Sequence, residues 1–288
     1  MFPTFRHLTA QTAMKYNELV LALDTVGVQD SVTEAHIILE ELFGISRAQI
    51  LLDRERDYDS SKIESVIEQR RNKIPLQHII GKWYFMGEQF AVSPDCLIPR
   101  PDTEILVYEA VKLLKRGGCV ADLCTGSGCI GISMLKQRPD IEKMILADIS
   151  EKALDIARAN ANALQASQSC DFELCDITKQ IPGGKYDMIV SNPPYIPSAD
   201  VSELSEEVKK EPFLALDGGE DGLDVINALI RLAPKHLNEG AYLLIEHGYD
   251  QGKEISAIMD EMIASGTYKN YRILKDYGGN DRVLVAQR

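Results

Sequence analysis

Two short segments of the chain contain residues whose types and spacing could support chemistry. The first, which we call the glycine loop, runs from Asp122 to Gly131 as Asp-Leu-Cys-Thr-Gly-Ser-Gly-Cys-Ile-Gly and matches G-x-G-x-x-G. Glycines allow a backbone to approach a ligand closely, and the N–H groups at the start of a helix can bind it. Asp148 follows Gly128 by twenty residues, the spacing at which a carboxylate accepts ribose hydroxyl groups. These residues predict a site for an adenosine-containing cofactor, either NAD or S-adenosyl-L-methionine.

The second segment is Asn192-Pro193-Pro194-Tyr195, which we call the acceptor loop. The side-chain oxygen of Asn192 and the carbonyl of Pro193 can each accept one N–H of a planar NH2 group. Two prolines restrict the backbone there, and the Tyr195 ring can stack on a conjugated plane. A hydride-transfer enzyme does not need such acceptors. The acceptor loop therefore favours S-adenosyl-L-methionine over NAD, with Asn192 and Tyr195 as the catalytic residues.

Both segments follow apolar runs that are typical of buried strands, and strand-like and helix-like patterns alternate from residue 119 onward. We expect strands at 119–123, 143–148, 171–175, 187–191, 241–246, 271–275 and 283–286, and helices at 127–137, 150–164, 223–237 and 253–263. Such alternation predicts an α/β fold with a Rossmann-like, mostly parallel sheet, and the short connection before residue 283 makes the last strand antiparallel. Because the carboxyl ends of parallel strands meet at one edge, the two loops should face the same pocket.

The chain before residue 101 has a different pattern. Residues 1–75 show helical periodicity, with capping boxes expected at Ser31 and Ser61, and predict a small helical bundle. Residues 77–92 resemble a β-hairpin, and Pro101 suits the first turn of a helix that runs to about residue 115. We therefore expect a helical domain at 1–75, a hairpin linker at 76–100 and a catalytic domain at 101–288.

Composition limits the class of protein. Of the 288 residues, 45% are hydrophobic and 26% charged, which is typical of a globular protein, and the net charge of −13 disfavours binding to a phosphate backbone. No run of about 18 apolar residues or signal-like N-terminus is present, so we expect a cytoplasmic protein with no membrane partner. Six cysteines without a C-x-x-C pair or a histidine pair predict reduced thiols and no metal site.

Further motifs lie outside these two segments. They are Gly81-x-x-x-Phe85, Leu97-Ile98-Pro99-Arg100-Pro101-Asp102-Thr103-Glu104, Glu211-Pro212-x-x-Ala215-Leu216, Gly219-x-Asp221-Gly222-Leu223 and Glu246-His247-Gly248. With these motifs the chain resembles, over nearly its whole length, the PrmC/HemK-type family of S-adenosylmethionine-dependent N5-glutamine methyltransferases. Cys124 stands where many members have glycine, and a cysteine fits there if its φ is negative.

The resemblance implies a class I methyltransferase fold and a role for each matching position. Five residues, Cys124, Thr125, Gly126, Ser127 and Gly128, would line the methionine part of the cofactor, beside Asn192. Asp148 would hold the ribose, and Asp176 and Ile177 would flank the adenine. Asn192, Pro193, Pro194 and Tyr195 would hold the glutamine amide in the Gly-Gly-Gln loop of a class 1 peptide chain release factor, with the helical domain recognising that protein.

The remaining motif residues receive weaker assignments. Arg100 could reach the mouth of the site or pair with an acidic residue, and Glu246 and His247 are expected to be structural. The resemblance implies methyl transfer to the amide nitrogen, with S-adenosyl-L-homocysteine as the product. The chemistry needs positioning and electrostatic stabilisation and no general base.

Three alternatives remain at this point. The acceptor loop alone is also typical of adenine-N6 nucleic-acid methyltransferases, which the acidic net charge disfavours. A sister enzyme type methylates a glutamine of a ribosomal protein. A cofactor-binding assembly factor without catalysis would not need Asn192 and Tyr195.

Overall fold

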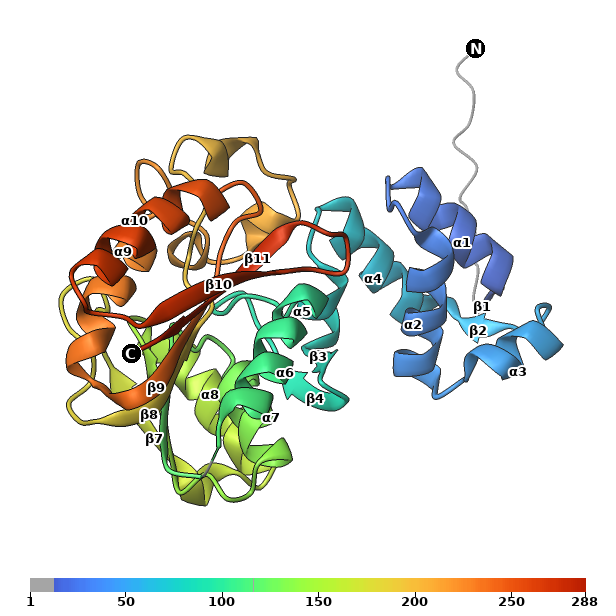
Figure 1. Ribbon diagram of the computed structural model, residues 1–288. Helices are drawn as coiled ribbons and strands as arrows, with labels where there is room; N and C mark the ends of the chain where they lie inside the picture. The colour runs from blue at the N-terminus through green and yellow to red at the C-terminus, as the bar shows by residue number, and fades with distance from the viewer. Residues whose placement is uncertain (1–12, 116) are drawn as a thin grey trace, which may run out of the picture. The chain divides into compact units, whose positions relative to one another are not determined.

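The structure is a computed structural model that describes residues 13–115 and 117–288 (Figure 1). The chain divides into two compact units, residues 1–80 and residues 81–288, and each is described by itself. The first twelve residues of the predicted helical domain lie outside the described residues.

The first unit is a bundle of short helices, which confirms the prediction. Its elements are β1 (Ala13–Met14), α1 (Tyr16–Thr25), α2 (Ser31–Phe43), α3 (Arg47–Leu52), β2 (Tyr58–Asp59), α4 (Ser60–Arg71) and α5 (Leu76–Ile80), with β1 and β2 paired antiparallel. Apolar side chains from helices α1 to α5 form one core that includes Leu19, Leu39, Ile50 and Ile63, all fully buried. Helical spacing of these residues places them on the inner faces.

For both predicted capping boxes, the predicted N-cap residue is wrong. Asp30, not Ser31, caps α2, and its side chain accepts a hydrogen bond from the N–H of Thr33 at 3.0 Å. Asp59 caps α4 and accepts from the N–H of Ser61 at 3.0 Å. Aspartate is as strong an N-cap as serine and is favoured by the helix dipole, so the helices begin one or two residues earlier.

The second unit contains a seven-stranded sheet in the order β10-β11-β9-β8-β5-β6-β7. Its strands are β5 (Cys119–Leu123), β6 (Lys143–Asp148), β7 (Cys170–Leu174), β8 (Tyr186–Ser191), β9 (Leu237–Glu246), β10 (Asn270–Lys275) and β11 (Asp281–Gln287). Strands β7, β6, β5, β8 and β9 are parallel, and β11 pairs antiparallel with both β9 and β10. The predicted mostly parallel sheet with an antiparallel last strand is confirmed.

Helices cover both faces of this sheet (Figure 1). On one face lie α6 (Glu104–Leu113), α7 (Cys129–Gln137) and α8 (Glu151–Ala163), and on the other α9 (Asp224–Leu232) and α10 (Gly252–Ala264). Short 3-10 turns complete the unit: η1 (Pro101–Thr103), η2 (Ser167–Ser169), η3 (Asp200–Glu203), η4 (Val208–Lys210), η5 (Phe213–Ala215) and η6 (Ala233–Lys235). Two apolar cores, one on each face, fix the sheet between the helices.

Two predicted helices have different bounds in the structure. The helix expected at 223–237 ends at Leu232, because the turn η6 with Pro234 follows it, and β9 already begins at Leu237. The helix expected from Ser127 begins at Cys129, since residues 124–128 form the turn between β5 and α7.

The predicted hairpin exists but is shorter than residues 77–92. It consists of β3 (Lys82–Phe85) and β4 (Glu88–Ala91), and the residues just before it form α5. Phe85 and Phe90 are buried in a core of the second unit, with ring centroids 6.2 Å apart. The side chain of Asn160 on α8 joins this hairpin to the glycine loop. It accepts from the N–H of Ala91 at 2.7 Å and donates to the carbonyls of Ala91 and Ser127 at 3.0 and 2.8 Å.

Candidate functional site

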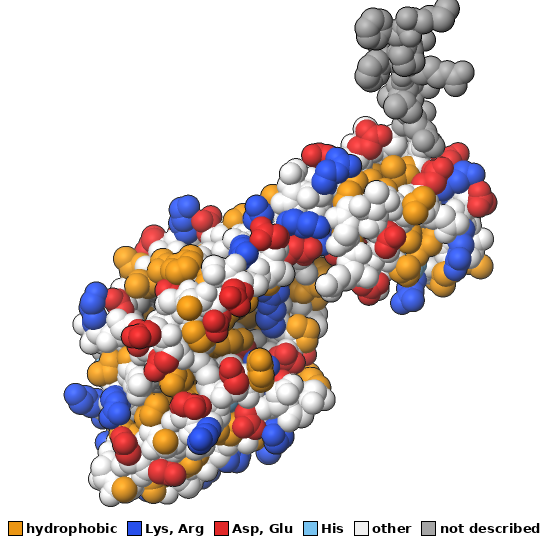
Figure 2. Space-filling view, turned by 90° about the horizontal axis from the view of Figure 1, so that it is seen from above, with side chains coloured by type: hydrophobic (Ala, Val, Ile, Leu, Met, Phe, Trp, Pro, Cys, Tyr) orange, Lys and Arg blue, Asp and Glu red, His pale blue; other side chains and the backbone are white. Residues whose placement is uncertain are grey.

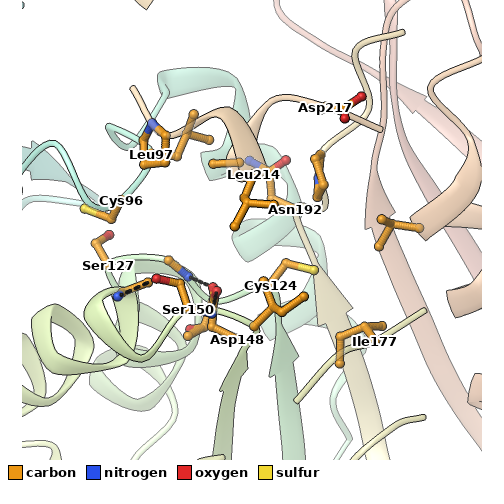
Figure 3. A pocket seen from close by; sticks show the side chains of 18 of the residues that line it. Cys96, Leu97, Cys124, Ser127, Asp148, Ser150, Ile177, Asn192, Leu214 and Asp217 are labelled. Carbon is orange, nitrogen blue, oxygen red and sulfur yellow. Dashed lines mark hydrogen bonds between the residues drawn. The ribbon is translucent and has the colours of Figure 1, made fainter. Parts of the chain in front are cut away.

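A cavity of about 350 Å³ opens at the carboxyl ends of β5, β6 and β8, where the sequence placed the site (Figure 3). This volume lies within the range of small-molecule sites. The predicted residues that line it are Cys124, Thr125, Gly126, Ser127, Asp148, Asp176, Ile177, Asn192 and Pro194. The structure therefore brings both loops to one pocket, while Gly128, Pro193 and Tyr195 are outside its lining.

The glycine loop is held in shape by the buried carboxylate of Asp122 at the end of β5. Its Oδ2 accepts from the Thr125 hydroxyl at 2.7 Å and from the N–H of Gly131 at 2.9 Å. A Cβ at Gly131 would meet Leu146 at 2.5 Å, so this glycine allows α7 to pack closely on the sheet. Gly126 has a φ of +55°, and a Cβ at this position would have no atom of the described residues within 4 Å. A ligand can therefore approach the backbone there.

Cys124 contradicts the expected negative φ, because its φ is +58°. A non-glycine residue in this left-handed region costs free energy on the order of 1 kcal/mol. The position requires the conformation that glycine adopts readily. Cys124 nevertheless lines the cavity, and burial raises the pKa of its thiol, so the neutral thiol is the form that faces a ligand.

Asp148 ends β6 and lies at the base of the cavity near Ser150 (Figure 3). Its two carboxylate oxygens accept backbone N–H groups of Gly126 and Ser150, each at 2.9 Å. Burial raises the pKa of this carboxyl, although the N–H bonds lower it in part. Each oxygen retains a second lone pair, so the carboxylate can still accept two hydroxyl groups of a ribose.

Asp176 and Ile177 follow β7 and also line the cavity. One oxygen of Asp176 accepts from the N–H and hydroxyl of Thr178 at 3.0 and 2.6 Å, and the other pairs with Lys179 at 2.7 Å. These interactions lower the pKa of Asp176, which keeps it ionised. Ile177 is buried and adds an apolar wall. The pair suits a flat, partly polar group such as a nucleobase.

Asn192 comes directly after β8, and its two side-chain ends differ in their contacts. Nδ2 donates to the Thr103 hydroxyl at 3.2 Å, whereas Oδ1 is buried and has no hydrogen-bond partner among residues 13–115 and 117–288. The residue lines the cavity (Figure 3). A buried acceptor without a partner costs free energy unless a ligand satisfies it, so Asn192 provides an acceptor for an external N–H group.

Tyr195, the last residue of the acceptor loop, is held by a hydrogen bond to its backbone. Nε2 of the buried Gln251 donates to the carbonyl of Tyr195 at 2.9 Å and to that of Gly222 at 3.1 Å. The Tyr195 side chain packs on the core beside α9 and α10, and burial raises its pKa to about 12. Stacking of this ring on a substrate stays a prediction.

Arg100 pairs with the buried carboxylate of Glu211, and the other oxygen of Glu211 accepts from the N–H of Ile98 at 2.9 Å. Arg100 therefore pairs with an acid and also lines the cavity, so the two expectations for this residue are both met. The same carboxylate joins the segment before α6 to the segment that carries Leu214, and side chains of both segments line the cavity.

Several lining residues have no counterpart among the predicted site residues. They include Leu97, Thr103, Ser150, Leu214 and Asp217. Thr103 lies 89 positions from Asn192 in the sequence, and only the fold brings the two together. Leu97 and Thr103 belong to the quoted proline-rich motif, so that motif was the available signal.

Other observations bear on the remaining expectations. All six cysteines are free, and four are buried. In the part of the chain that the structure describes, we find no helix long and apolar enough to span a membrane.

Family models match two parts of the chain. Residues 7–81 match the PrmC N-terminal domain, and residues 101–213 match the methyltransferase small domain. The release factor glutamine methyltransferase of Aquifex aeolicus is 35% identical over 260 residues, covering 88% of this chain and 90% of that protein. The enzyme of the same name from Moorella thermoacetica is 36% identical over 276 residues, covering 94% and 96%.

A solved structure shows a similar fold. The catalytic domain of hMettl16, in complex with the MAT2A 3'UTR hairpin 6, matches with a TM-score of 0.56 and 13% sequence identity, covering 90% of this chain and 81% of that one. At this identity the similarity concerns the methyltransferase fold alone.

Proposed function

The chain belongs to the release factor glutamine methyltransferase family and is a protein-(glutamine-N5) methyltransferase, and on this basis we propose how its pocket works. S-adenosyl-L-methionine binds between the glycine loop, Asp148 and the Asp176–Ile177 segment. The glutamine side chain of the Gly-Gly-Gln motif in a class 1 peptide chain release factor enters beside Asn192. The second product of the methyl transfer is S-adenosyl-L-homocysteine.

The observation that carries this proposal is Oδ1 of Asn192, which has no hydrogen-bond partner within the described part of the chain and belongs to a residue that lines the same cavity as Gly126 and Asp148. Open space at the Gly126 backbone and two carboxylate oxygens with remaining lone pairs fit the polar end and ribose of this cofactor. Ile177 and the aliphatic lining fit its adenine.

The cofactor supplies a methyl group already activated on a sulfonium. The chain's own residues have to hold the amide nitrogen in line with that methyl group. Oδ1 of Asn192 accepts one N–H of the glutamine amide, and the carbonyl of Pro193 is the proposed acceptor for the other. An amide nitrogen is a weak nucleophile, and two acceptors on its N–H groups stabilise the positive charge that develops on it. After the methyl group has been transferred, the methylated nitrogen loses one N–H proton and the amide becomes neutral. Positioning of this kind can contribute several kcal/mol.

The partner is proposed to be a release factor, with residues 1–75 recognising it. The relatives from Aquifex aeolicus and Moorella thermoacetica are named release factor glutamine methyltransferases, which favours this substrate over a ribosomal protein. On the face seen in Figure 2, Lys and Arg side chains are interspersed with Asp and Glu side chains. With a net charge of −13, this distribution gives no support to nucleic acid as the substrate.

The test is methyl transfer from radiolabelled S-adenosyl-L-methionine to a purified class 1 release factor. We expect incorporation into the intact factor and none into a control factor whose Gly-Gly-Gln glutamine is replaced by alanine. A purified ribosomal protein and an RNA should remain unlabelled under the same conditions. Labelling of either one in preference to the release factor would contradict the proposed substrate.

A further inference from the structure

The two ends of the acceptor loop are held in different ways. Asn192 follows β8 directly, and Ser191, the last residue of that strand, pairs with both β5 and β9. Tyr195, at the other end, lies outside the strands of the sheet. The carbonyl of Pro193, which the function proposed above uses as an acceptor, lies between the two ends. If that function is right, the position of this carbonyl depends on what holds Tyr195.

The side chain of Gln251 holds Tyr195 in place. Gln251 precedes α10 as its N-cap residue and is 7% exposed. Its Nε2 donates to the carbonyls of Tyr195 and Gly222 at 2.9 and 3.1 Å, and its Oε1 accepts from the N–H of Gly248 at 2.8 Å. Backbone N–H groups only donate and carbonyls only accept, so these three partners determine the orientation of the amide. Both protons of Nε2 are used.

Glycines allow the backbone to come close enough for these bonds. Gly222 has a φ of +75°, and a Cβ at this position would collide with the carbonyl oxygen of Tyr195 and lie 2.7 Å from Nε2 of Gln251. A Cβ at Gly218 would lie 2.8 Å from the Cα of Tyr195. Gly218 and Gly219 line the cavity. One amide therefore links the acceptor loop to the segment that forms another part of the cavity wall.

We propose that Gln251 is a positioning residue for methyl transfer, which fixes the backbone of Tyr195 and thereby the acceptor loop. The two prolines restrict the chain between its fixed ends. The carbonyl of Pro193 then keeps its place and does not have to reorganise when charge develops on the substrate nitrogen. Gln251 is outside the lining of the cavity, so it acts through the loop and not on the substrate.

The direction of the Gln251 side chain supports this role. An N-cap side chain commonly accepts a hydrogen bond from the first turn of its own helix. Among the described residues, the Gln251 side chain makes no such bond to α10 and instead reaches three other segments. Burial of an amide is costly unless its hydrogen bonds are made. The contacts with Tyr195, Gly222 and Gly248 account for a glutamine at this position.

The experiment first replaces the amide with an apolar side chain of similar length, in Gln251→Met. We expect kcat for release-factor methylation to fall about 10-fold, since a small displacement of a positioning group slows a reaction strongly. The Kd for S-adenosyl-L-homocysteine in calorimetry should stay within about twofold of wild type. The calorimetric stoichiometry counts folded molecules, so kcat is expressed per cofactor-binding site. The control is Gln137→Met at the exposed end of α7.

A second variant, Gly222→Ala, disturbs the same contact from its other side. Its control is Gly266→Ala, because Gly266 has a φ of +73° and a Cβ there would meet no described atom within 4 Å. Both alanines are placed in the left-handed region, so the backbone strain is matched. We expect an about 10-fold lower kcat for Gly222→Ala alone. Combined with Gln251→Met, its loss should be smaller than the product of the two single losses.

A wild-type kcat per binding site in both Gln251→Met and Gly222→Ala would overturn the inference. Loss of cofactor binding in both variants would also overturn it, because Gln251 would then support the second unit as a whole. If only one of the two variants folds, that variant decides. Failure of the proposed function looks different, since Asn192→Ala would then retain normal turnover.

Discussion

At the scale of single residues, the cofactor side of the site depends on Asp148. Removing this carboxylate takes away charge-assisted bonds to hydroxyl groups, each worth roughly 1.5–3 kcal/mol. We expect Asp148→Ala to weaken binding of S-adenosyl-L-homocysteine by at least about 10-fold in calorimetry. Asp148→Asn retains the shape and should lose less.

Asp171→Ala is the matched control, since that carboxylate pairs with Lys143 and is not part of the cavity lining. It should bind like wild type. Equal affinities of Asp148→Ala and the control would remove Asp148 from the cofactor site.

The substrate side depends on Asn192. Asn192→Ala removes the acceptor that strengthens as charge develops on the amide nitrogen, so the methylation rate should fall roughly 10²–10³-fold, as for a deleted oxyanion-hole donor. Cofactor affinity should change much less. The exposed Asn162 on α8 offers a matched Asn→Ala control in a rate assay with release factor. Near-normal turnover of the Asn192 variant would show that the chemistry takes place elsewhere.

At this scale the sequence predicted the residues that follow strands. The spacing of the glycines indicates a backbone that a ligand can approach, and the two prolines indicate a rigid loop. It did not predict Thr103, whose hydrogen-bond partner Asn192 lies 89 positions later in the sequence, after β8. It was wrong about the φ of Cys124, since residue type favours negative φ while the ligand-facing turn requires a positive one.

At the scale of elements, the succession of strands and helices followed from hydrophobic periodicity, the mostly parallel sheet from their alternation, and the antiparallel last strand from its short connection; the order of the strands in the sheet was not predicted. Helix ends were less predictable, because several residues compete to cap one helix. Asp30 and Asp59 cap their helices in place of the predicted serines, and α9 ends before the turn that contains Pro234. A titratable side chain that is buried at the end of a strand makes stability depend on pH, and hydrophobic periodicity does not predict this.

Glu246 is such a side chain, buried at the end of β9. Burial raises its pKa from an ordinary 4.5 to about 7. Between these values the unfolded chain has lost the proton that the folded protein retains, so the free energy of unfolding contributed by this group falls as pH rises from about 4.5 to about 7. Glu246→Gln has no such proton to lose.

We therefore expect Glu246→Gln to gain stability relative to wild type as pH rises, by on the order of 2 kcal/mol between about pH 5 and about pH 7.5. Urea unfolding of both proteins at the two pH values measures this difference. A difference that is the same at both pH values would mean that Glu246 ionises normally in the folded protein.

At the scale of the whole molecule, the two compact units have separate tasks in our proposal. All residues that line the cavity lie between Asp95 and Val225, within the second unit. A truncated chain of residues 81–288 should bind S-adenosyl-L-homocysteine with an affinity close to that of the full chain. It should methylate release factor poorly, because it lacks the unit proposed to recognise that protein.

Steady-state kinetics with increasing release factor can separate the two effects, since loss of recognition raises KM before it lowers kcat. The full chain is the control in both assays. Full activity of the truncated chain at low release-factor concentration would assign recognition to the catalytic unit alone.

The side chain of Asn160 connects two places that are far apart along the sequence, the hairpin strand at Ala91 and the glycine loop at Ser127. Ser127 lines the cavity, so this amide is the route by which a ligand-induced change in the loop would reach the hairpin that follows the first unit in the chain. Thermodynamic linkage makes this transmission reciprocal. Any free energy that binding of a partner to the hairpin contributes to these three bonds would change ligand affinity at the loop by the same amount.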